Sequence, residues 1–295
     1  MTIPEAIWKL GEERLVARQA RDFALADQIR DRLAELGWEI FDQAGSFELR
    51  EKLKYTVIEN LRVMTAIIEP GEIAIAMIIQ GFEGDAVATV ASIRQFSDVP
   101  IVLLCLDEVG PLVDVINEKT TVIKVEEQCG WGPAANALLG NIPSQFLIIM
   151  DPSTRFLGDA ITPVLAQLNE GTFSGVGWRG GLINVDDEWR SVDDKGPGEV
   201  DVLFSYLLAV DRQAAIEVGG FNARALYYRN ADIEFSLRMR HAGGHLLQMD
   251  LPLVQDRHHG YHDVDSDFRE VQSKKNYDRI LERFRGKNAI LSPRR

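Results

Sequence analysis

The sequence predicts an α/β protein with a mostly parallel sheet flanked by helices and a small helical appendage at its N-terminus. From Glu72 onwards, short apolar runs alternate with helical patterns at the spacing typical of a parallel sheet. About the first fifty residues show helical periodicity instead. Polar side chains follow directly after the apolar runs, which is where open α/β sheets bind their ligands.

The N-terminal part, residues 1–54, is expected to be a small helical module. Pro4 suits the first turn of one helix, and a second helix begins after Asp22 and ends at Gly37. Short strands are expected on either side of Gly45. A unit of this size has a marginal core by itself. We therefore expect it to pack on the rest of the chain or on a second chain, which leaves a homo-oligomer open.

The larger part of the chain carries the alternation of strands and helices. Residues 55–71 are expected to be a linker, residues 72–287 the α/β domain, and residues 288–295 a tail. Strands are predicted over residues 73–79, 101–106, 121–125 and 146–150, and helices over residues 85–96, 112–117 and 133–139.

Composition excludes several classes of protein. The 295 residues include 32 Lys and Arg against 45 Asp and Glu, a net charge of −13, which argues against a general nucleic-acid binder. Two cysteines cannot make a disulfide framework or a four-thiolate zinc site. No apolar run approaches the length of a membrane span, and the N-terminus has no signal-peptide core. We therefore expect a cytoplasmic protein.

Charge is distributed unevenly along the chain. Residues 55–254 contain 13 basic and 27 acidic side chains, whereas residues 255–295 contain 10 basic and 7 acidic ones. From Ser273 onwards, the basic side chains follow a helical pattern. Such a segment either faces an anionic ligand or forms an ordinary solvated helix. Charge alone favours the solvated helix.

Carboxylates recur at adjacent strand ends of the predicted sheet. Glu83 follows the first strand, Asp107 the second, and Asp151 the fourth. They suit ribose hydroxyls, the edge of a base, or a divalent cation that holds phosphates. No glycine-rich loop of the dinucleotide or P-loop type follows the first strand. Hydride-transfer enzymes and P-loop ATPases are therefore disfavoured.

The order and spacing of these motifs, from about Glu72 to Gly286, resemble the GT-A fold of nucleotide-sugar glycosyltransferases, most like family 2. In that family the first strand opens a nucleotide pocket, the second ends in an aspartate near the base and ribose, and a Gly-rich turn with an Asn follows the third. The resemblance implies a nucleotide-binding set in this chain: Gln80, Phe82, Glu83, Asp107, Gly130 and Asn136.

The metal motif of the family, Asp-x-Asp, falls on Asp151 and Ser153. The resemblance implies a divalent cation, Mn or Mg, although a hydroxyl is a poorer ligand for a hard cation than a carboxylate. A late histidine completes the cation site in metal-using members, which implies His258 or His259 here. Three alternatives stay open: metal dependence is weakened or absent, Asp151 caps the turn that follows it, or the histidines form a zinc site. Adjacent histidines in a strand would point apart, which disfavours the zinc site.

The segment from Asn230 to Gly243 is similar to the helix that carries the catalytic base in the family. The match implies that Asp232 is the base and Glu234 a second acid, although Ala231 departs from the pattern. Both acids could instead serve only the helix dipole at a helix start.

The resemblance implies a glycosyltransferase of the hexosyl-transferring type, acting from a nucleotide-diphosphate sugar on a hydroxyl acceptor. It also implies inversion at the anomeric carbon, with Asp232 as general base. A retaining GT-A transferase stays open as an alternative. So does a catalytically impaired module that only binds nucleotide sugars, which Ser153 and Ala231 favour.

The N-terminal stretch from Ala17 to Gly37 resembles the small C-terminal helical module of cysteinyl-tRNA synthetases. No catalytic signature of a synthetase appears elsewhere in the chain. A borrowed structural or docking module is therefore favoured over an interaction protein that contacts tRNA or a synthetase.

Overall fold

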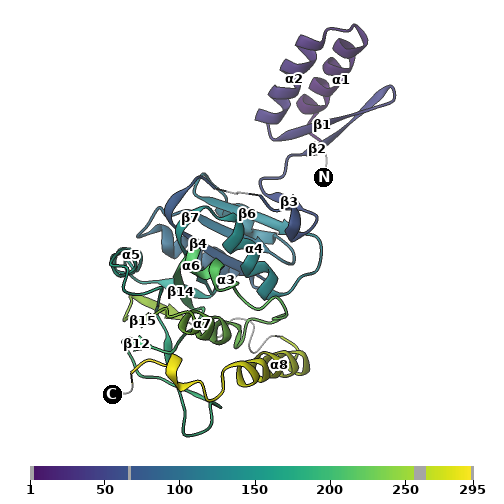
Figure 1. Ribbon diagram of the computed structural model, residues 1–295. Helices are drawn as coiled ribbons and strands as arrows, with labels where there is room; N and C mark the ends of the chain where they lie inside the picture. Colours follow the sequence, from purple (N-terminus) through teal and green to yellow (C-terminus); the bar gives the residue numbers. More distant parts are fainter. Residues whose placement is uncertain (1–2, 66–67, 256–263, 294–295) are drawn as a thin grey trace. The chain divides into compact units, whose positions relative to one another are not determined.

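The computed structural model describes residues 3–65, 68–255 and 264–293 of the chain. The chain divides into two units, Met1–Lys54 and Tyr55–Arg295 (Figure 1). The expected linker, residues 55–71, belongs to the second unit, because it contributes strand β3 (Thr56–Ile58) and the start of β4 (Gly71–Ile79) to the main sheet.

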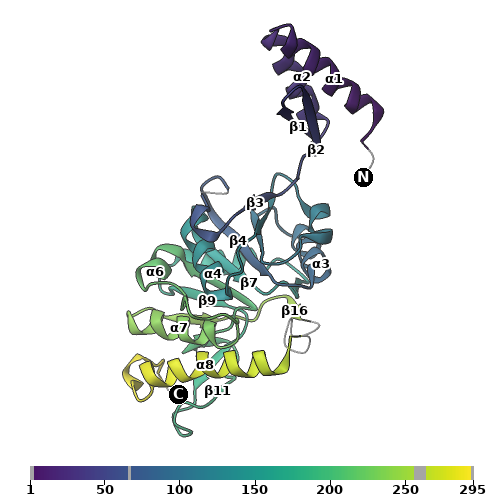
Figure 2. The ribbon, with the colours of Figure 1, turned by 90° about the vertical axis from the view of Figure 1, so that its right-hand side faces the viewer.

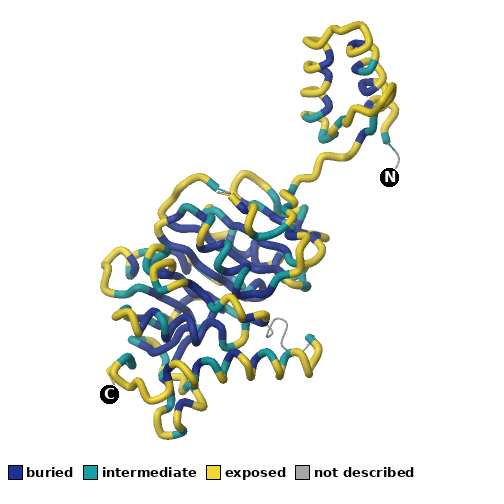
Figure 3. Tube along the Cα trace, turned by 45° about the vertical axis from the view of Figure 1, so that its right-hand side comes forward, coloured by how far each residue is buried: buried dark blue, intermediate teal, exposed yellow. Residues whose placement is uncertain are grey.

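The N-terminal unit consists of two helices and a hairpin, α1 (Glu5–Gln19), α2 (Phe23–Glu35), β1 (Trp38–Gln43) and β2 (Ser46–Glu51). Asp22 caps α2, its carboxylate accepting from the Leu25 N–H. Gly11 lets the helix approach the hairpin, since a Cβ there would lie 2.3 Å from the Phe47 ring. Arg14 donates to both carboxylate oxygens of Asp42, at 2.6 and 3.2 Å, which lowers the pKa of Asp42. The apolar faces of both helices are buried against each other and the hairpin (Figure 3).

The second unit is built on a nine-stranded sheet in the order β12-β15-β9-β14-β7-β4-β5-β6-β3. Strands β7, β4, β5, β6 and β3 run parallel, whereas β14 is antiparallel to both β7 and β9. The predicted mostly parallel sheet flanked by helices is therefore confirmed. Its remaining strands are β5 (Ile101–Cys105), β6 (Thr120–Val125), β7 (Ser144–Met150), β9 (Gly175–Gly177), β12 (Gly198–Val200), β14 (Leu207–Asp211) and β15 (Leu246–Gln248).

Side chains of alternate residues in β4 enter two separate hydrophobic layers, as the pleat requires. Ala74, Ala76 and Ile78 pack under α4 (Trp131–Asn141), α6 (Arg212–Glu217) and α7 (Ala231–His241). Ile73, Ile75 and Met77 pack under α3 (Glu83–Arg94), α5 (Ile161–Asn169) and the 3-10 helix η2 (Gly110–Val115). Both faces of the sheet are thus covered, which leaves its strand ends as the place for a ligand.

Short strands and turns extend this framework beyond the strand ends. They are η1 (Leu61–Val63), β8 (Thr154–Phe156), β10 (Gly180–Ile183), β11 (Val192–Asp193), β13 (Val202–Leu203) and β16 (Leu253–Gln255). Two small sheets form from them, β11-β10-β13 and β16-β8.

The C-terminal segment packs on the second unit rather than standing in solvent. Helix α8 (Ser266–Phe284) runs beside α7 (Figure 2) and buries Ile280 and Phe284. The expected tail contains η3 (Asn288–Ile290), after which Ser292 donates its N–H and hydroxyl to the buried Asp201 carboxylate, at 2.6 and 2.9 Å. Over the described residues, no helix combines the length and apolarity that crossing a membrane requires.

Candidate active site

A cavity of about 390 Å³, which we call the inner cavity, lies where strand β7 ends and helix α7 begins. Asp151 enters it directly after β7, and Asp232 from the first turn of α7. The segment before β14 and helix α8 complete its wall. Its lining residues are Asp151, Arg190, Ser191, Val192, Phe204, Ser205, Tyr206, Tyr228, Arg229, Asn230, Asp232, Ile233 and Tyr277.

Asp232 is buried, yet its carboxylate is held by neutral donors. Its Oδ2 accepts from the N–H of Ser205 at 2.9 Å and from the Ser205 hydroxyl at 3.2 Å, and its Oδ1 accepts from the Ile233 N–H at 2.9 Å. Burial raises the pKa of Asp232, although the hydrogen bonds from Ser205 and Ile233 oppose that shift. A carboxylate with a raised pKa is a stronger base than one in open water, which suits Asp232 to proton abstraction.

Asp151 is bound to its own turn. Its Oδ1 accepts from the Ser153 N–H at 2.8 Å and from the Ser153 hydroxyl at 2.6 Å. Gln255 donates to the same hydroxyl at 3.3 Å. Asp151 therefore does cap the turn that follows it, and this role exists beside its place in the cavity wall.

The donor set around Asp151 is a poor match for a hard dication. Mg and Mn sites combine several oxygen ligands, most often more than one carboxylate. Among the residues described here, no group of three or more His, Cys, Asp or Glu could hold a metal ion. Ser153, at the position of the second motif carboxylate, offers a hydroxyl that already donates to Asp151. His258 and His259 lie outside the described residues.

The segment Phe204–Tyr206, which sequence reasoning did not single out, positions both aspartates. Ser205 binds the Asp232 carboxylate, and the Tyr206 carbonyl accepts from the Asp151 N–H at 3.3 Å. Burial, together with the negative charges of Asp232 and Asp151, raises the pKa of the Tyr206 hydroxyl to about 12. The register places Leu207 opposite Met150, so that the residues before β14 lie next to the end of β7. Because the place of this segment depends on the antiparallel pairing, no local pattern in the sequence indicated it.

Three residues of the predicted nucleotide-binding set lie at the ends of β4 and β5. Phe82 adopts a left-handed conformation, with φ of 61°, and Glu83 begins α3 directly after it. Partial burial raises the pKa of Asp107, and the negative charges of Glu83 and Glu108 raise it further. Glu83 and Asp107 therefore lie within electrostatic reach of each other, as expected for neighbouring strand ends.

Gln80 and Asp151 line a smaller cavity of about 50 Å³, which we call the strand-end cavity. Trp131 of α4 and Tyr228 lie in the same wall. Asp151, Ser205 and Tyr228 also line the inner cavity. The two cavities therefore adjoin, with Asp151 at the boundary between them.

The remaining two residues of that set have structural surroundings. A Cβ on Gly130 would lie 2.7 Å from the Cα of Leu226, so glycine is needed where the two main chains meet. The Asn136 amide donates to the Phe221 carbonyl at 2.9 Å and accepts from the Phe221 N–H at 2.8 Å. The main chain of Phe221 thus bonds both the oxygen and the nitrogen of this amide, which supports a structural role for Asn136.

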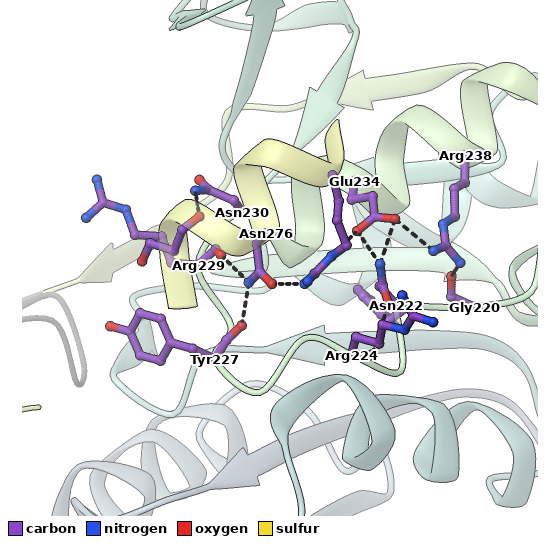
Figure 4. Close-up of polar contacts among 12 residues, drawn as sticks. Gly220, Asn222, Arg224, Tyr227, Arg229, Asn230, Glu234, Arg238 and Asn276 are labelled. Atoms are coloured by element: carbon purple, nitrogen blue, oxygen red, sulfur yellow. Dashed lines mark hydrogen bonds and ion pairs between the residues drawn. The ribbon is translucent and has the colours of Figure 1, made fainter. Parts of the chain in front are cut away.

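Glu234, expected as a second acid, does not line the inner cavity. It belongs to a partly buried group that we call the Glu234 cluster, made of Asn222, Glu234, Arg238 and Arg279. Figure 4 shows Asn222 and Arg238 around the Glu234 carboxylate. Asn222 donates to both of its carboxylate oxygens, at 2.8 and 3.0 Å, and Arg238 donates at 2.8 Å. These bonds tie the loop before α7 to the helix, so the surroundings of Glu234 support a structural role.

A third cavity, also of about 390 Å³, adjoins the inner cavity. We call it the outer cavity. The two share Val192, Phe204 and Tyr206. The inner cavity thus adjoins both the strand-end cavity and the outer cavity, which share none of their described lining residues with each other.

Comparison with known proteins confirms the fold. No protein-family model matches the chain. The structure of GalNAc-T7 with UDP, GalNAc and Mn2+ matches with a TM-score of 0.55 and 16% identity, covering 72% of this chain and 47% of that one. Mannosyltransferase PcManGT from Pyrobaculum calidifontis, in complex with GDP-Man and Mn2+, matches with a TM-score of 0.55 and 12% identity, covering 94% and 76%. The chain therefore has a GT-A glycosyltransferase fold.

The N-terminal part is similar to a different protein. Cysteine--tRNA ligase from Opitutus terrae (strain DSM 11246 / JCM 15787 / PB90-1) is 36% identical over 52 residues, which are 18% of this chain and 11% of the ligase. The chain thus spans about a tenth of the length of this curated relative and about half the length of GalNAc-T7.

Proposed function

We propose that the chain is a glycosyltransferase that moves a hexosyl group from a nucleotide-diphosphate sugar to a hydroxyl acceptor. One observation carries the proposal: Asp151 and Asp232, from distant parts of the sequence, line one cavity at the strand ends of a GT-A fold. GalNAc-T7 and PcManGT were both solved with a nucleotide or nucleotide sugar, which supports the same class of donor here.

In this proposal the nucleotide lies at the ends of β4 and β5. The carboxylates of Glu83 and Asp107 are acceptors for ribose hydroxyls and for N–H groups of a base. Partial burial raises the pKa of Asp107, and the negative charge of Glu83 raises it further; N–H and O–H groups of a bound nucleoside would relieve this repulsion. Gln80 lies between this region and Asp151, in the wall of the strand-end cavity.

The proposed chemistry centres on Asp232. The acceptor oxygen attacks the anomeric carbon of the donor sugar as its proton passes to a carboxylate oxygen of Asp232. The bond between that carbon and the diphosphate oxygen breaks, and the diphosphate leaves with the electron pair. Arg190 and Arg229 line the same cavity, and their positive charge offsets the charge that develops on the leaving group. A single displacement of this kind inverts the anomeric configuration.

No step of this proposal is routed through a metal ion. Both structural relatives were solved with Mn2+, but Asp151 and Ser153 offer one carboxylate and one hydroxyl that are already bonded to each other. In the described part of the inner cavity, positive charge comes from Arg190 and Arg229.

The first experiment measures binding and hydrolysis of UDP-, GDP- and dTDP-sugars by the full chain, with and without manganese. We expect at least one donor to bind and to be hydrolysed slowly, because water replaces the acceptor. If no donor binds and none is hydrolysed, the proposal is wrong. NMR analysis of the released sugar then gives the anomeric configuration, and retention would replace the inverting mechanism by a retaining one.

The Ser153 hydroxyl bound to Asp151 also favours a second candidate, a module that binds nucleotide sugars without turning them over. Such a module would bind one member of the panel without hydrolysing it, and no acceptor would restore turnover.

A further inference from the structure

The outer cavity combines aromatic rings with one guanidinium. Trp178, Phe204 and Tyr206 form its apolar wall, with ring centroids 6.5 Å apart for Trp178–Tyr206 and 6.3 Å apart for Phe204–Tyr206, both edge-to-face. The guanidinium of Arg179 lies over the Trp178 ring, 4.4 Å from its centroid. A large aromatic wall with few polar groups is typical of a small-molecule site.

Arg179 is held in place by the same segment that positions both aspartates. Its carbonyl accepts from the Phe204 N–H at 2.9 Å, and the neighbouring Trp178 N–H donates to the Leu207 carbonyl at 3.2 Å. Its positive charge acts on the Tyr206 hydroxyl, where it opposes the rise in pKa caused by burial, Asp232 and Asp151. The guanidinium therefore lies within electrostatic reach of the proposed catalytic centre.

No carboxylate in the described residues forms an ion pair with Arg179, whose side chain is exposed. Asp194 lines the same cavity, but its Oδ1 accepts from the Gly196 N–H of its own turn at 2.8 Å. Gln255, another polar group of the wall, donates to Ser153. Residues 55–254 are strongly acidic, with 27 acidic against 13 basic side chains. An exposed cation that pairs with none of the described carboxylates in such an acidic body is suited to an anionic ligand.

Stacking on Trp178 orients the guanidinium for this task. A guanidinium that lies over an aromatic ring keeps its N–H groups available to donate to other partners. Two parallel N–H donors match the two oxygens of a carboxylate or a phosphate.

We propose that the outer cavity receives the acceptor and that Arg179 binds an anionic group of it, a carboxylate or a phosphate. This inference rests on the proposed function, since that function places the nucleotide sugar at the strand-end cavity, which has no described lining residue in common with the outer cavity. The acceptor hydroxyl then reaches Asp232 past the shared wall of Phe204 and Tyr206.

The test measures binding of two matched pairs of probes to the full chain by calorimetry, in the absence of a nucleotide sugar. Methyl β-glucuronide is compared with methyl β-glucoside, and glucose 6-phosphate with glucose. We expect one anionic probe to bind at least about tenfold more tightly than its neutral counterpart, as for a charge-assisted bidentate contact. The pair that shows the difference tells whether the acceptor carries a carboxylate or a phosphate.

Arg179→Gln should abolish this preference and leave binding of the neutral probes unchanged. Arg283→Gln is the matched control, because Arg283 also lies over an aromatic ring, that of Phe284 at 5.1 Å, but lines neither the inner nor the outer cavity. It should keep the wild-type preference.

Binding of UDP and GDP to the same variants shows whether Arg179 contacts the acceptor or the nucleotide sugar. Arg179→Gln should leave both affinities unchanged, and an equal loss of nucleotide and anionic-probe binding would overturn the proposal by assigning Arg179 to the donor. The proposal also fails if neither anionic probe binds more tightly than its neutral counterpart, or if Arg179→Gln keeps the preference. Donor hydrolysis, measured on the same preparations, shows separately whether the proposed function itself holds.

Discussion

The first turn of helix α7 carries two buried carboxylates in two different surroundings. Glu234 is 2% exposed and meets Arg238, Arg279 and the Asn222 amide. Asp232 is 6% exposed and lies at the wall of a cavity, where its carboxylate accepts from the Ser205 N–H and hydroxyl and from the Ile233 N–H. A carboxylate neutralised by arginines holds structure together, whereas one held by neutral donors beside open space keeps its ability to take a proton.

Asp232→Asn should have the largest effect on turnover. The amide keeps the size of the side chain and accepts from Ser205, but it cannot take a proton. We expect kcat to fall by about 10²- to 10⁴-fold, with the free energy of unfolding unchanged or higher, because the raised pKa of Asp232 means that its buried charge costs stability. Steady-state kinetics and chemical denaturation check both parts, and a variant with wild-type kcat would remove Asp232 as the base.

Glu234→Gln is the matched change within the same helical turn. It should lower the free energy of unfolding and leave kcat almost unchanged, the opposite of Asp232→Asn. Removing the charge leaves Arg238 and Arg279 without their carboxylate in a largely buried cluster, with side chains 13% and 22% exposed. We expect a loss of about 2 kcal/mol in the free energy of unfolding, below the range for fully buried pairs because both arginines are partly exposed. kcat below the unfolding temperature should change little, and a drop matching that of Asp232→Asn would show that Glu234 shares in the chemistry.

Ser205→Ala should act through the pKa of Asp232. The Ser205 hydroxyl favours the ionised carboxylate, so its loss raises the pKa of Asp232 further. Since the base works in its ionised form, activity falls as the pH drops through that pKa, and the acidic limb of the pH–rate profile should move to higher pH. At high pH kcat should stay within about tenfold of wild type, because the Ser205 N–H still donates. If the acidic limb does not move, Ser205 does not act on the catalytic base.

The comparison of Asp232 with Glu234 also shows how far the sequence alone leads. The parallel strands and the place of Asp151 were predictable, because apolar runs and the residues that follow them are local patterns. Asp232 was singled out by the resemblance of its segment to a family motif. The structural surroundings of Glu234 were not predictable. Arg279 comes from α8 and Asn222 from a loop, and no local pattern indicates that they contact Glu234. Ser205 and Tyr206 were not predicted as site residues for the same reason, because their place depends on the antiparallel pairing of β14 with β7.

Ser153→Asp should have the smallest effect on turnover. It tests whether Asp151, the second aspartate of the inner cavity, can take part in a metal site. In the native chain the Ser153 hydroxyl donates to the Asp151 Oδ1. Ser153 therefore offers Asp151 a hydrogen bond at the position where the Asp-x-Asp motif has a second carboxylate, the kind of ligand that Mn2+ prefers. A second carboxylate repels the first unless a cation lies between them, which should tighten Mn2+ binding by about tenfold. Calorimetric titration of Mn2+ measures this, with Ser153→Ala as the control that removes the hydroxyl without adding charge. If Ser153→Asp binds Mn2+ no more tightly than Ser153→Ala, the two side chains do not face a common ion, and the resemblance of this turn to a metal motif is one of sequence alone.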